Sequence, residues 1–167
     1  LSEYGLAIGA DTAQSRPGDV LEYSAAAGGA AFFVGKDRSI AHLLATHSYV
    51  SDTPDFWRRP HQEHPEHVGR FSGEPAYFHH IKSATQALLK KENIDIQKID
   101  HCIFHTPNGK FPKLIAKELG CSSQQLQHSL MVDRIGNTYA AASLLALVSV
   151  LDHAKKGEKI LVTSYGS

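Results

Sequence analysis

The feature that most constrains the fold is the order of helical and strand patterns after residue 73. Apolar residues recur at helical spacing in some segments and form short apolar runs in others. Two such runs predict strands, His101–His105 and Lys159–Ser164. Helices are predicted from Glu74–Pro75 to Lys91, over Lys110–Leu119 and Ser122–His128, and from Asn137 or Thr138 to about His153. This alternation is typical of an α/β fold with a layered sheet.

Residues at the helix ends support these boundaries. Pro75 suits the first turn of a helix, because its missing N–H would have no partner there. Gly120 is placed to cap the C-terminal end of the helix before it. The run from Tyr139 to Leu151 is apolar but shorter than the roughly 20 residues that span a bilayer. It therefore predicts a buried helix and no membrane span.

The first part of the chain has a different pattern. Tyr4–Ala10 predicts a short buried strand, and the Gly-rich stretch Tyr23–Gly35 ends in a second strand. A further strand is expected over Ile40–Val50. Asp52–Gly73 contains three prolines and shows no regular period, so we expect a long loop. The predicted units are therefore residues 1–52, a connecting loop over 53–73, and residues 74–167.

Composition limits the class of protein. Lys plus Arg and Asp plus Glu both number 17, so the formal net charge is zero. A general nucleic-acid binder would usually show a basic excess, and we therefore expect no nucleic-acid partner. The two cysteines are too few for a disulfide scaffold, which favours a reducing, cytoplasmic setting.

Two short motifs carry candidate chemistry. His105 ends a predicted strand in His-Thr-Pro-Asn-Gly, and side chains at strand ends often line the ligand crevice of an α/β fold. Asn137, in Gly-Asn-Thr-Tyr, precedes the apolar helix. Taken singly, each residue has a structural explanation, a histidine satisfied by a turn and an asparagine that caps a helix. Alternatively, both side chains face a ligand.

Together, the motifs resemble a known family. A His at a strand end, Gly-Asn-Thr before a small-residue helix, and a strand ending in Ser-Tyr-Gly-Ser are similar to thiolase-fold condensing enzymes. The details are closest to archaeal-type 3-hydroxy-3-methylglutaryl-CoA synthases. The supporting stretches are Ile8–Ala13, Ser24–Gly35, Phe56–Pro60 and His105–Lys113. The resemblance implies an α/β, thiolase-like layered α-β-α-β-α fold, of which this chain covers the end of the first half and most of the second.

The resemblance also implies a reaction. In this family a Cys accepts an acetyl group from acetyl-CoA, and a Glu removes a proton from the acetyl methyl group. The carbanion attacks the ketone of acetoacetyl-CoA, and hydrolysis frees the product. His105 matches the His that holds and protonates the acceptor carbonyl oxygen, a role suited to a side chain that titrates near neutral pH. Asn137 matches the Asn that shares oxyanion stabilisation.

Further expectations follow from the same resemblance. No cofactor is implied beyond the coenzyme A thioester substrates. The expected partners are a second copy of the chain and, in archaea, an acetoacetyl-CoA thiolase and a zinc-ribbon/OB-fold scaffold protein. Ser167, in the Ser-Tyr-Gly-Ser ending, is expected to contact substrate.

The family's nucleophilic Cys and its Glu lie upstream of Tyr4 in the resemblance. We therefore expect an internal piece of a longer protein, or one part of a split enzyme. Cys102 is no substitute, because strand alternation turns it away from His105. Cys121 follows a helix C-terminus, where the dipole should raise the pKa of a thiol. The alternatives are a third-class ketoacyl-ACP synthase and a non-catalytic thiolase-like scaffold subunit.

Two clusters of charged or polar residues remain. Lys110 and Lys113 follow the His105 motif and are candidates for the phosphates of coenzyme A, although a solvated helix face is the alternative. His61, His64 and His67 recur every third residue. The prolines of that loop prevent a regular face and no fourth ligand joins them, so we expect no metal site.

Overall fold

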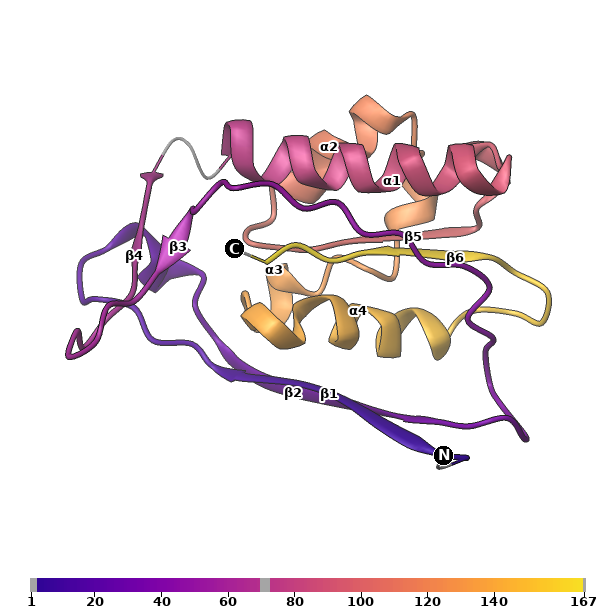
Figure 1. Ribbon diagram of the computed structural model, residues 1–167, viewed down its shortest axis with the longest axis horizontal. Coiled ribbons are helices and arrows are strands. Elements are labelled where there is room, and N and C mark those ends of the chain that lie inside the picture. The colour runs from indigo at the N-terminus through magenta and orange to yellow at the C-terminus, as the bar shows by residue number, and fades with distance from the viewer. Residues whose placement is uncertain (1–2, 70–72, 167) are drawn as a thin grey trace.

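The computed structural model describes residues 3–69 and 73–166, which stack in layers (Figure 1). Two helices form one outer layer and two parallel strands lie beneath them. A third helix follows, and an antiparallel pair of strands forms the opposite face. In that order the elements are α1 (Phe78–Glu92) and α2 (Phe111–Leu119), β5 (His101–Phe104) and β6 (Ile160–Thr163), α4 (Ala142–Leu151), and β1 (Gly5–Thr12) and β2 (Ala27–Val34).

The β5–β6 pair forms the centre of the molecule. Alternate side chains of β5 point to opposite sides of the pair, as strand geometry requires. Cys102 and Phe104 pack with α1 and α2, in a cluster that includes Ile115. Ile103 packs on the other side against Ala146 and Val150 of α4. The strands are therefore covered on both faces, which is the usual condition of parallel strands.

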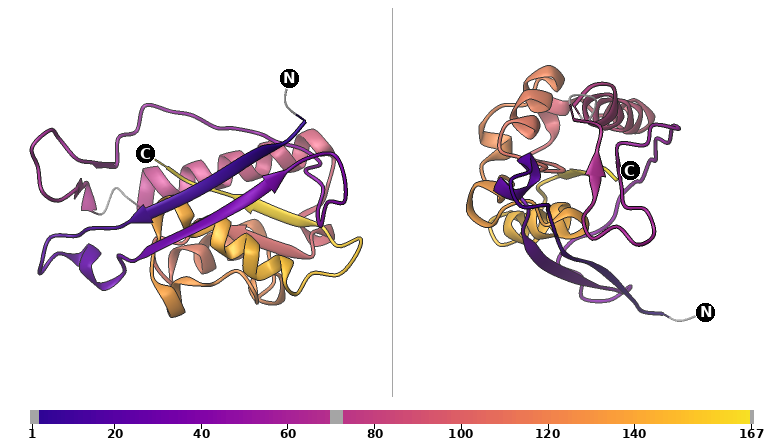
Figure 2. Two further views of the ribbon diagram at one scale, coloured as in Figure 1. Left: turned by 90° about the horizontal axis from the view of Figure 1, so that it is seen from below. Right: turned by 90° about the vertical axis from the view of Figure 1, so that its left-hand side faces the viewer.

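Glycines let β1 and β2 pack closely against the residues just before α4. A Cβ on Gly9 would lie 2.5 Å from the carbonyl oxygen of Ala140, and one on Gly28 would lie 2.6 Å from Thr138 Cγ2. The opposite face of the pair carries Leu6 and Ile8, which are 61% and 64% exposed. Figure 2 shows no described element over that face. The prediction of a buried strand here is therefore wrong for one of its two faces.

Short elements join the layers. The predicted helix over Ser122–His128 is only a short 3-10 helix, and a further helical turn, α3, was not predicted. Their bounds are η1 (Val20–Tyr23), β3 (Phe56–Trp57), β4 (Glu66–His67), η3 (Gly73–Tyr77), η4 (Ile96–Lys98), η5 (Gln124–Leu126), α3 (Val132–Ile135) and η6 (Tyr139–Ala141). None of the helices in the described ranges is long and apolar enough to cross a bilayer.

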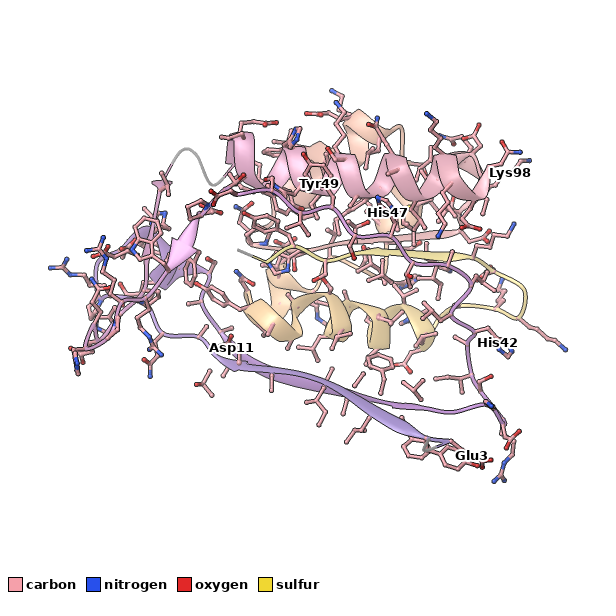
Figure 3. The ribbon with its side chains drawn as sticks, in the orientation of Figure 1. Glu3, Asp11, His42, His47, Tyr49 and Lys98 are labelled. Carbon is pink, nitrogen blue, oxygen red and sulfur yellow. The ribbon has the colours of Figure 1, made fainter. Side chains whose placement is uncertain are left out.

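Two local predictions are wrong. Residues 40–50 form no strand, and only the later part of this segment, with His47 and Tyr49, runs beside α1 (Figure 3), where the hydroxyl of Tyr49 hydrogen-bonds to His79 at 2.8 Å. Pro75 does not lie in the first turn of α1, which begins at Phe78. Glu74 before it is extended, with φ −123° and ψ 131°, because a proline disfavours the helical conformation of the preceding residue.

The loop predicted over 53–73 is irregular apart from the short β3–β4 pair, as far as the structure describes it. Residues 70–72 lie outside the described ranges. The boundaries at 52 and 73 stay a prediction. The hairpin of β1 and β2 packs directly on α4, so the two predicted halves share a contact surface.

Candidate functional site

His105 lies directly after β5, and both polar atoms of its backbone are bonded. Its N–H donates to the carbonyl oxygen of Thr163 in β6 at 2.9 Å. Its own carbonyl oxygen accepts a hydrogen bond from the hydroxyl of Tyr77 at 2.6 Å. The residue is only 7% exposed. The main chain at His105 is therefore held from two sides before any ligand arrives.

The imidazole ring of His105, in contrast, has no hydrogen bond to any residue in 3–69 or 73–166, and its Nδ1 is fully buried. Burial lowers the pKa of His105 from 6.5 to about 4, because the charged form would lose its hydration. The expectation that this side chain titrates near neutral pH is therefore wrong. At pH 7 the ring is neutral, with one N–H to donate and one nitrogen to accept.

Asn137 is fixed by the backbone around it. Its N–H donates to the carbonyl of Ser24 at 2.6 Å, and its carbonyl accepts from the N–H of Ala26 at 2.9 Å. Gly136 makes this approach possible, since a Cβ there would lie 2.7 Å from Ser24 O. The side-chain Oδ1 accepts the N–H of Tyr139 at 2.9 Å, at the start of η6.

Asn137 therefore agrees in part with both explanations of its motif, the structural one and the ligand-binding one. Its oxygen accepts the N–H of Tyr139, the first residue of the turn that leads into α4, although the N-cap residue itself is Thr138. Its side-chain nitrogen donates to no residue of the described ranges, although Asn137 is only 5% exposed. The free N–H pair is available to a ligand oxygen.

Topology brings His105 and Asn137 to the same end of the molecule. Strands β5 and β6 are parallel, and α4 runs back along them, starting where β6 ends (Figure 1). His105 follows the end of β5, and Asn137 precedes the start of α4. Side-chain alternation along β5 also places position 105 on the side of Ile103, which faces α4.

The lysines near the motif differ from each other. Lys113 Nζ lies 3.4 Å from Asp133 Oδ2, and both side chains are more than half exposed. Lys110 is exposed and forms no ion pair with a described residue. Ser167 lies outside the described residues. A phosphate role thus stays a prediction, and the structure leaves Lys110 the freer cation of the two.

The histidine-rich loop does not assemble a ligand set. His67 Nε2 lies 3.4 Å from Asp19 Oδ1, and His64 Nε2 lies 3.9 Å from Glu63 Oε2. Across residues 3–69 and 73–166, no group of three His, Cys, Asp or Glu side chains has the geometry to hold a metal ion.

The two cysteines are neighbours in space, with 3.7 Å between their Sγ atoms. Cys102 is fully buried, as predicted. Its hydrogen bond with Cys121, followed by burial, raises the pKa of Cys102. The same bond lowers the pKa of Cys121, which contradicts the upward shift predicted from the helix dipole. That neither thiol acts as a nucleophile stays a prediction.

Two residues that build the site were not predicted to do so. Tyr77 falls within a predicted helix, and its bond to His105 joins positions 28 residues apart. Asn108 Oδ1 accepts the N–H groups of Lys110 and Phe111, each at 2.9 Å, and so caps α2. An Asn shortly before a helix is a recognisable capping signal. The Tyr77 contact has no such local signal.

Two of the hollows on the surface lie at opposite ends of the layers. One, of about 290 Å³, lies where β1 ends, and Asp11 (labelled in Figure 3), Arg58 and Tyr139 line it. The other, of about 420 Å³, lies at the far end of β5, where the His128 ring contacts the rings of His101 and His153 and His101 Nε2 lies 3.0 Å from Glu158 Oε2. Neither hollow includes His105 or Asn137 in its lining.

The chain is similar to several known proteins. Residues 89–167 match the family described as 3-Oxoacyl-[acyl-carrier-protein (ACP)] synthase III C terminal. Curated relatives named hydroxymethylglutaryl-CoA synthase include those of Methanopyrus kandleri, 53% identical over 165 residues, and Archaeoglobus fulgidus, 54% identical over 165 residues. Each alignment covers 99% of this chain. The chain spans about half the length of these relatives, 47% and 48%.

Solved structures support the fold at lower identity. A hydroxymethylglutaryl-CoA synthase complexed with CoA matches 94% of this chain and 44% of its own, with a TM-score of 0.73 and 23% identity. The 3-oxoacyl-(acyl carrier protein) synthase III of Pseudomonas aeruginosa matches 98% of this chain and 55% of its own, with a TM-score of 0.82 and 18% identity. The predicted thiolase-like fold is confirmed. Along nearly its whole length the chain is similar to archaeal hydroxymethylglutaryl-CoA synthases, of which it spans about half.

Proposed function

We propose that this chain supplies the acceptor-activating side of an enzyme that condenses acetyl-CoA with acetoacetyl-CoA to give 3-hydroxy-3-methylglutaryl-CoA. The observation that carries the proposal is the buried imidazole of His105, whose nitrogens bond to no described residue, at the same end of the molecule as the free amide nitrogen of Asn137. The sequence similarity to hydroxymethylglutaryl-CoA synthases supports the choice of reaction.

The chemistry of the two side chains suits that role. When a carbanion attacks the ketone of acetoacetyl-CoA, negative charge develops on the ketone oxygen. A neutral imidazole N–H and a carboxamide N–H can both donate to this oxygen. A donor fixed in advance and shielded from water lowers such a barrier by roughly 3–4 kcal/mol. His105 then passes its N–H proton to the oxygen, which becomes the product hydroxyl, and the proton that the Glu removed from the acetyl methyl group restores the neutral ring.

The remaining steps need groups that lie upstream of Tyr4 in the family resemblance. A Cys carries the acetyl group and a Glu removes the methyl proton. Coenzyme A thioesters are the substrates in this proposal, and no metal or prosthetic group takes part. Lys110, and less directly Lys113, would meet the phosphates of coenzyme A, and Ser167 would contact the acyl end.

The proposal includes a cellular setting drawn from the resemblance. The enzyme would work in the cytoplasm, in the mevalonate route to isoprenoids. It would pair with a second copy of itself. In archaea its further partners would be an acetoacetyl-CoA thiolase and a zinc-ribbon/OB-fold scaffold protein. Copurification and light scattering of the longer protein test these assemblies directly.

A second candidate is favoured by a specific observation. The family model that matches residues 89–167 is that of 3-oxoacyl-ACP synthase III, and a structure of that class gives a TM-score of 0.82. An acyl-carrier-protein enzyme would use a substrate carried on acyl carrier protein in place of acetoacetyl-CoA, so assaying the two substrates separates the two candidates. A non-catalytic scaffold subunit, the third candidate, would use neither and would instead stabilise a partner enzyme.

The test replaces His105 with Ala in a longer protein that also carries the nucleophilic Cys and the Glu. Joining this chain to the upstream segment of a relative provides such a protein. We expect condensation with acetoacetyl-CoA to fall by roughly 100- to 1000-fold, because the developing oxyanion loses a fixed donor. Acetylation of the Cys, followed with labelled acetyl-CoA, should change far less.

The matched control is His42→Ala, which removes an exposed histidine from the irregular segment before Tyr49. This variant should condense like the parent protein. Unchanged condensation in His105→Ala would show that His105 does not activate the acceptor, and the proposed role would then have to be abandoned.

A further inference from the structure

The segment around α1 contacts the backbone of His105 by two routes, and we propose that Tyr77 and Thr85 are positioning residues that aim the His105 ring at its substrate. This inference rests on the proposed function, since it assumes that His105 acts on the acceptor. It concerns two residues that touch neither the imidazole nitrogens nor any group expected to react. Their influence would pass through the main chain.

Tyr77 provides the first route. Its hydroxyl donates to the carbonyl oxygen of His105 at 2.6 Å, and the residue is 1% exposed. The ring is enclosed by Phe78, Phe111 and Tyr165, with centroids 5.2, 5.3 and 5.8 Å away. Burial raises the pKa of Tyr77 far above its ordinary value, so the hydroxyl keeps its proton. The Tyr77 hydroxyl therefore stays protonated and is held in place as a hydrogen-bond donor to His105.

Thr85 provides the second route, through β6. Its Oγ1 lies 2.9 Å from Oγ1 of Thr163, and both side chains are buried. The carbonyl oxygen of Thr163 accepts the N–H of His105 at 2.9 Å. Helix α1 thus holds the last residue of β6, and that residue holds the peptide nitrogen of His105.

These two routes fix the peptide units on both sides of the His105 Cα. The direction of the Cα–Cβ bond follows from those two peptide planes. The ring has no hydrogen bond of its own to orient it within residues 3–69 and 73–166. Its aim therefore depends on the main chain and on packing, including Tyr165, whose ring centroid is 6.3 Å away. A misplacement of about 1 Å at a reacting group can cost on the order of 100-fold in rate.

The experiment measures each half-reaction in the longer protein described above. Tyr77→Phe removes one hydroxyl and keeps the ring, and Thr85→Val removes the other with little change in volume. We expect each variant to lower kcat for condensation by roughly 10- to 100-fold. Acetylation of the nucleophilic Cys should stay within about twofold of the parent, because that step does not use His105 in the proposal.

Two further proteins separate positioning from general stability. Tyr49→Phe is the matched control, since it deletes a tyrosine hydroxyl that bonds to His79 on the exposed side of α1. Its kinetics should equal those of the parent. Introducing p-aminophenylalanine at position 77 keeps an N–H donor near the His105 carbonyl and should restore most of the condensation rate.

The outcomes are distinct. Condensation within twofold of the parent in Tyr77→Phe and Thr85→Val would overturn the positioning role, as would an equal loss of acetylation and condensation. If Tyr77→Phe fails to fold, Thr85→Val decides by the same criterion. His105→Ala is measured in parallel. A defect there with normal Tyr77→Phe and Thr85→Val kinetics rejects only this inference, whereas normal condensation in His105→Ala rejects the proposed function.

Discussion

At the scale of single residues, His105 combines nearly complete burial with a ring that bonds to no described residue. A buried polar group without a partner normally costs stability, and such groups concentrate where a ligand will complete them. The backbone of the same residue is bonded at both ends, to Thr163 and Tyr77. The hydrogen bonds at His105 thus fix its main chain, and its ring remains available to bond to a ligand.

The lowered pKa of His105 predicts an acid-sensitive fold. The folded-state pKa of about 4 lies below the ordinary value of 6.5, so between these values the unfolded chain binds more protons. The stability that comes from keeping His105 neutral is fully present above about pH 6.5 and is lost as the pH falls toward 4. The loss should reach roughly 3 kcal/mol in the free energy of unfolding.

Urea unfolding at a series of pH values checks this expectation. His105→Gln keeps a polar side chain that does not titrate, so its free energy of unfolding should fall less between pH 7 and pH 4 than that of the parent. Parallel curves for the two proteins over this range would mean that His105 is not held neutral by burial.

At the scale of elements, the site depends on the contact between the residues just before β2 and the residues that lead into α4. Residues 24–26 and Asn137 exchange backbone hydrogen bonds, and Ala25 and Asn137 form a parallel bridge. Gly136 permits this junction, with φ 79° and ψ −174°, a conformation open almost only to glycine. Tyr139, two residues beyond Asn137, also has a positive φ, of 46°, so the backbone is strained on both sides of Asn137.

Gly136→Ala should therefore destabilise the longer protein by about 2–4 kcal/mol, through backbone strain and through a Cβ placed 2.7 Å from Ser24 O and 2.8 Å from Ala26 Cβ. Thermal unfolding measures the effect. Gly157→Ala is the control, because Gly157 also has a positive φ, of 92°, but has open space around it. Equal losses in both variants would show that the contact with residues 24–26 contributes nothing.

At the scale of the whole molecule, the outer face of the β1–β2 pair is apolar and uncovered. Leu6, Ile8 and Phe33 are 61%, 64% and 75% exposed, and the pairing of Leu6 with Phe33 places them on one face. The inner face, lined by small residues such as Gly9 and Gly28, packs on α4. A contiguous apolar face of this kind normally marks a contact surface.

We expect this chain, expressed by itself, to bind a hydrophobic dye and to self-associate. Replacing Leu6 and Ile8 together with Lys should lower dye fluorescence and shift the chain toward monomer in light scattering. Leu43→Lys is the matched control, because Leu43 is 86% exposed but lies outside the sheet. If the control reduces dye binding as much as the double variant does, the β1–β2 face is not the surface that binds the dye.

Most of the fold in residues 74–166 follows from local patterns. The helix over Phe111–Leu119 with its cap at Gly120, and the strands at His101 and Ile160, lie close to their predicted positions. The predictions were wrong where one sequence pattern is compatible with more than one structure. Residues 40–50 have a strand-like composition, but no neighbouring strand pairs with them in the described chain. The apolar run of Tyr4–Ala10 correctly indicated a strand, but the prediction that this strand is buried is wrong for its outer face.

By itself, the sequence determined the resemblance to hydroxymethylglutaryl-CoA synthases and most of the alternating elements, and it predicted two residues that act on substrate, because these depend on residue types and spacings along the chain. Only the tertiary structure decided that His105 is neutral, that Tyr77 and Thr85 hold its backbone, and that Asn137 accepts the N–H of Tyr139 and keeps a free donor. The physical reason is distance along the chain. Burial and hydrogen bonding at His105 come from segments about 20 to 60 residues away, which no local pattern encodes.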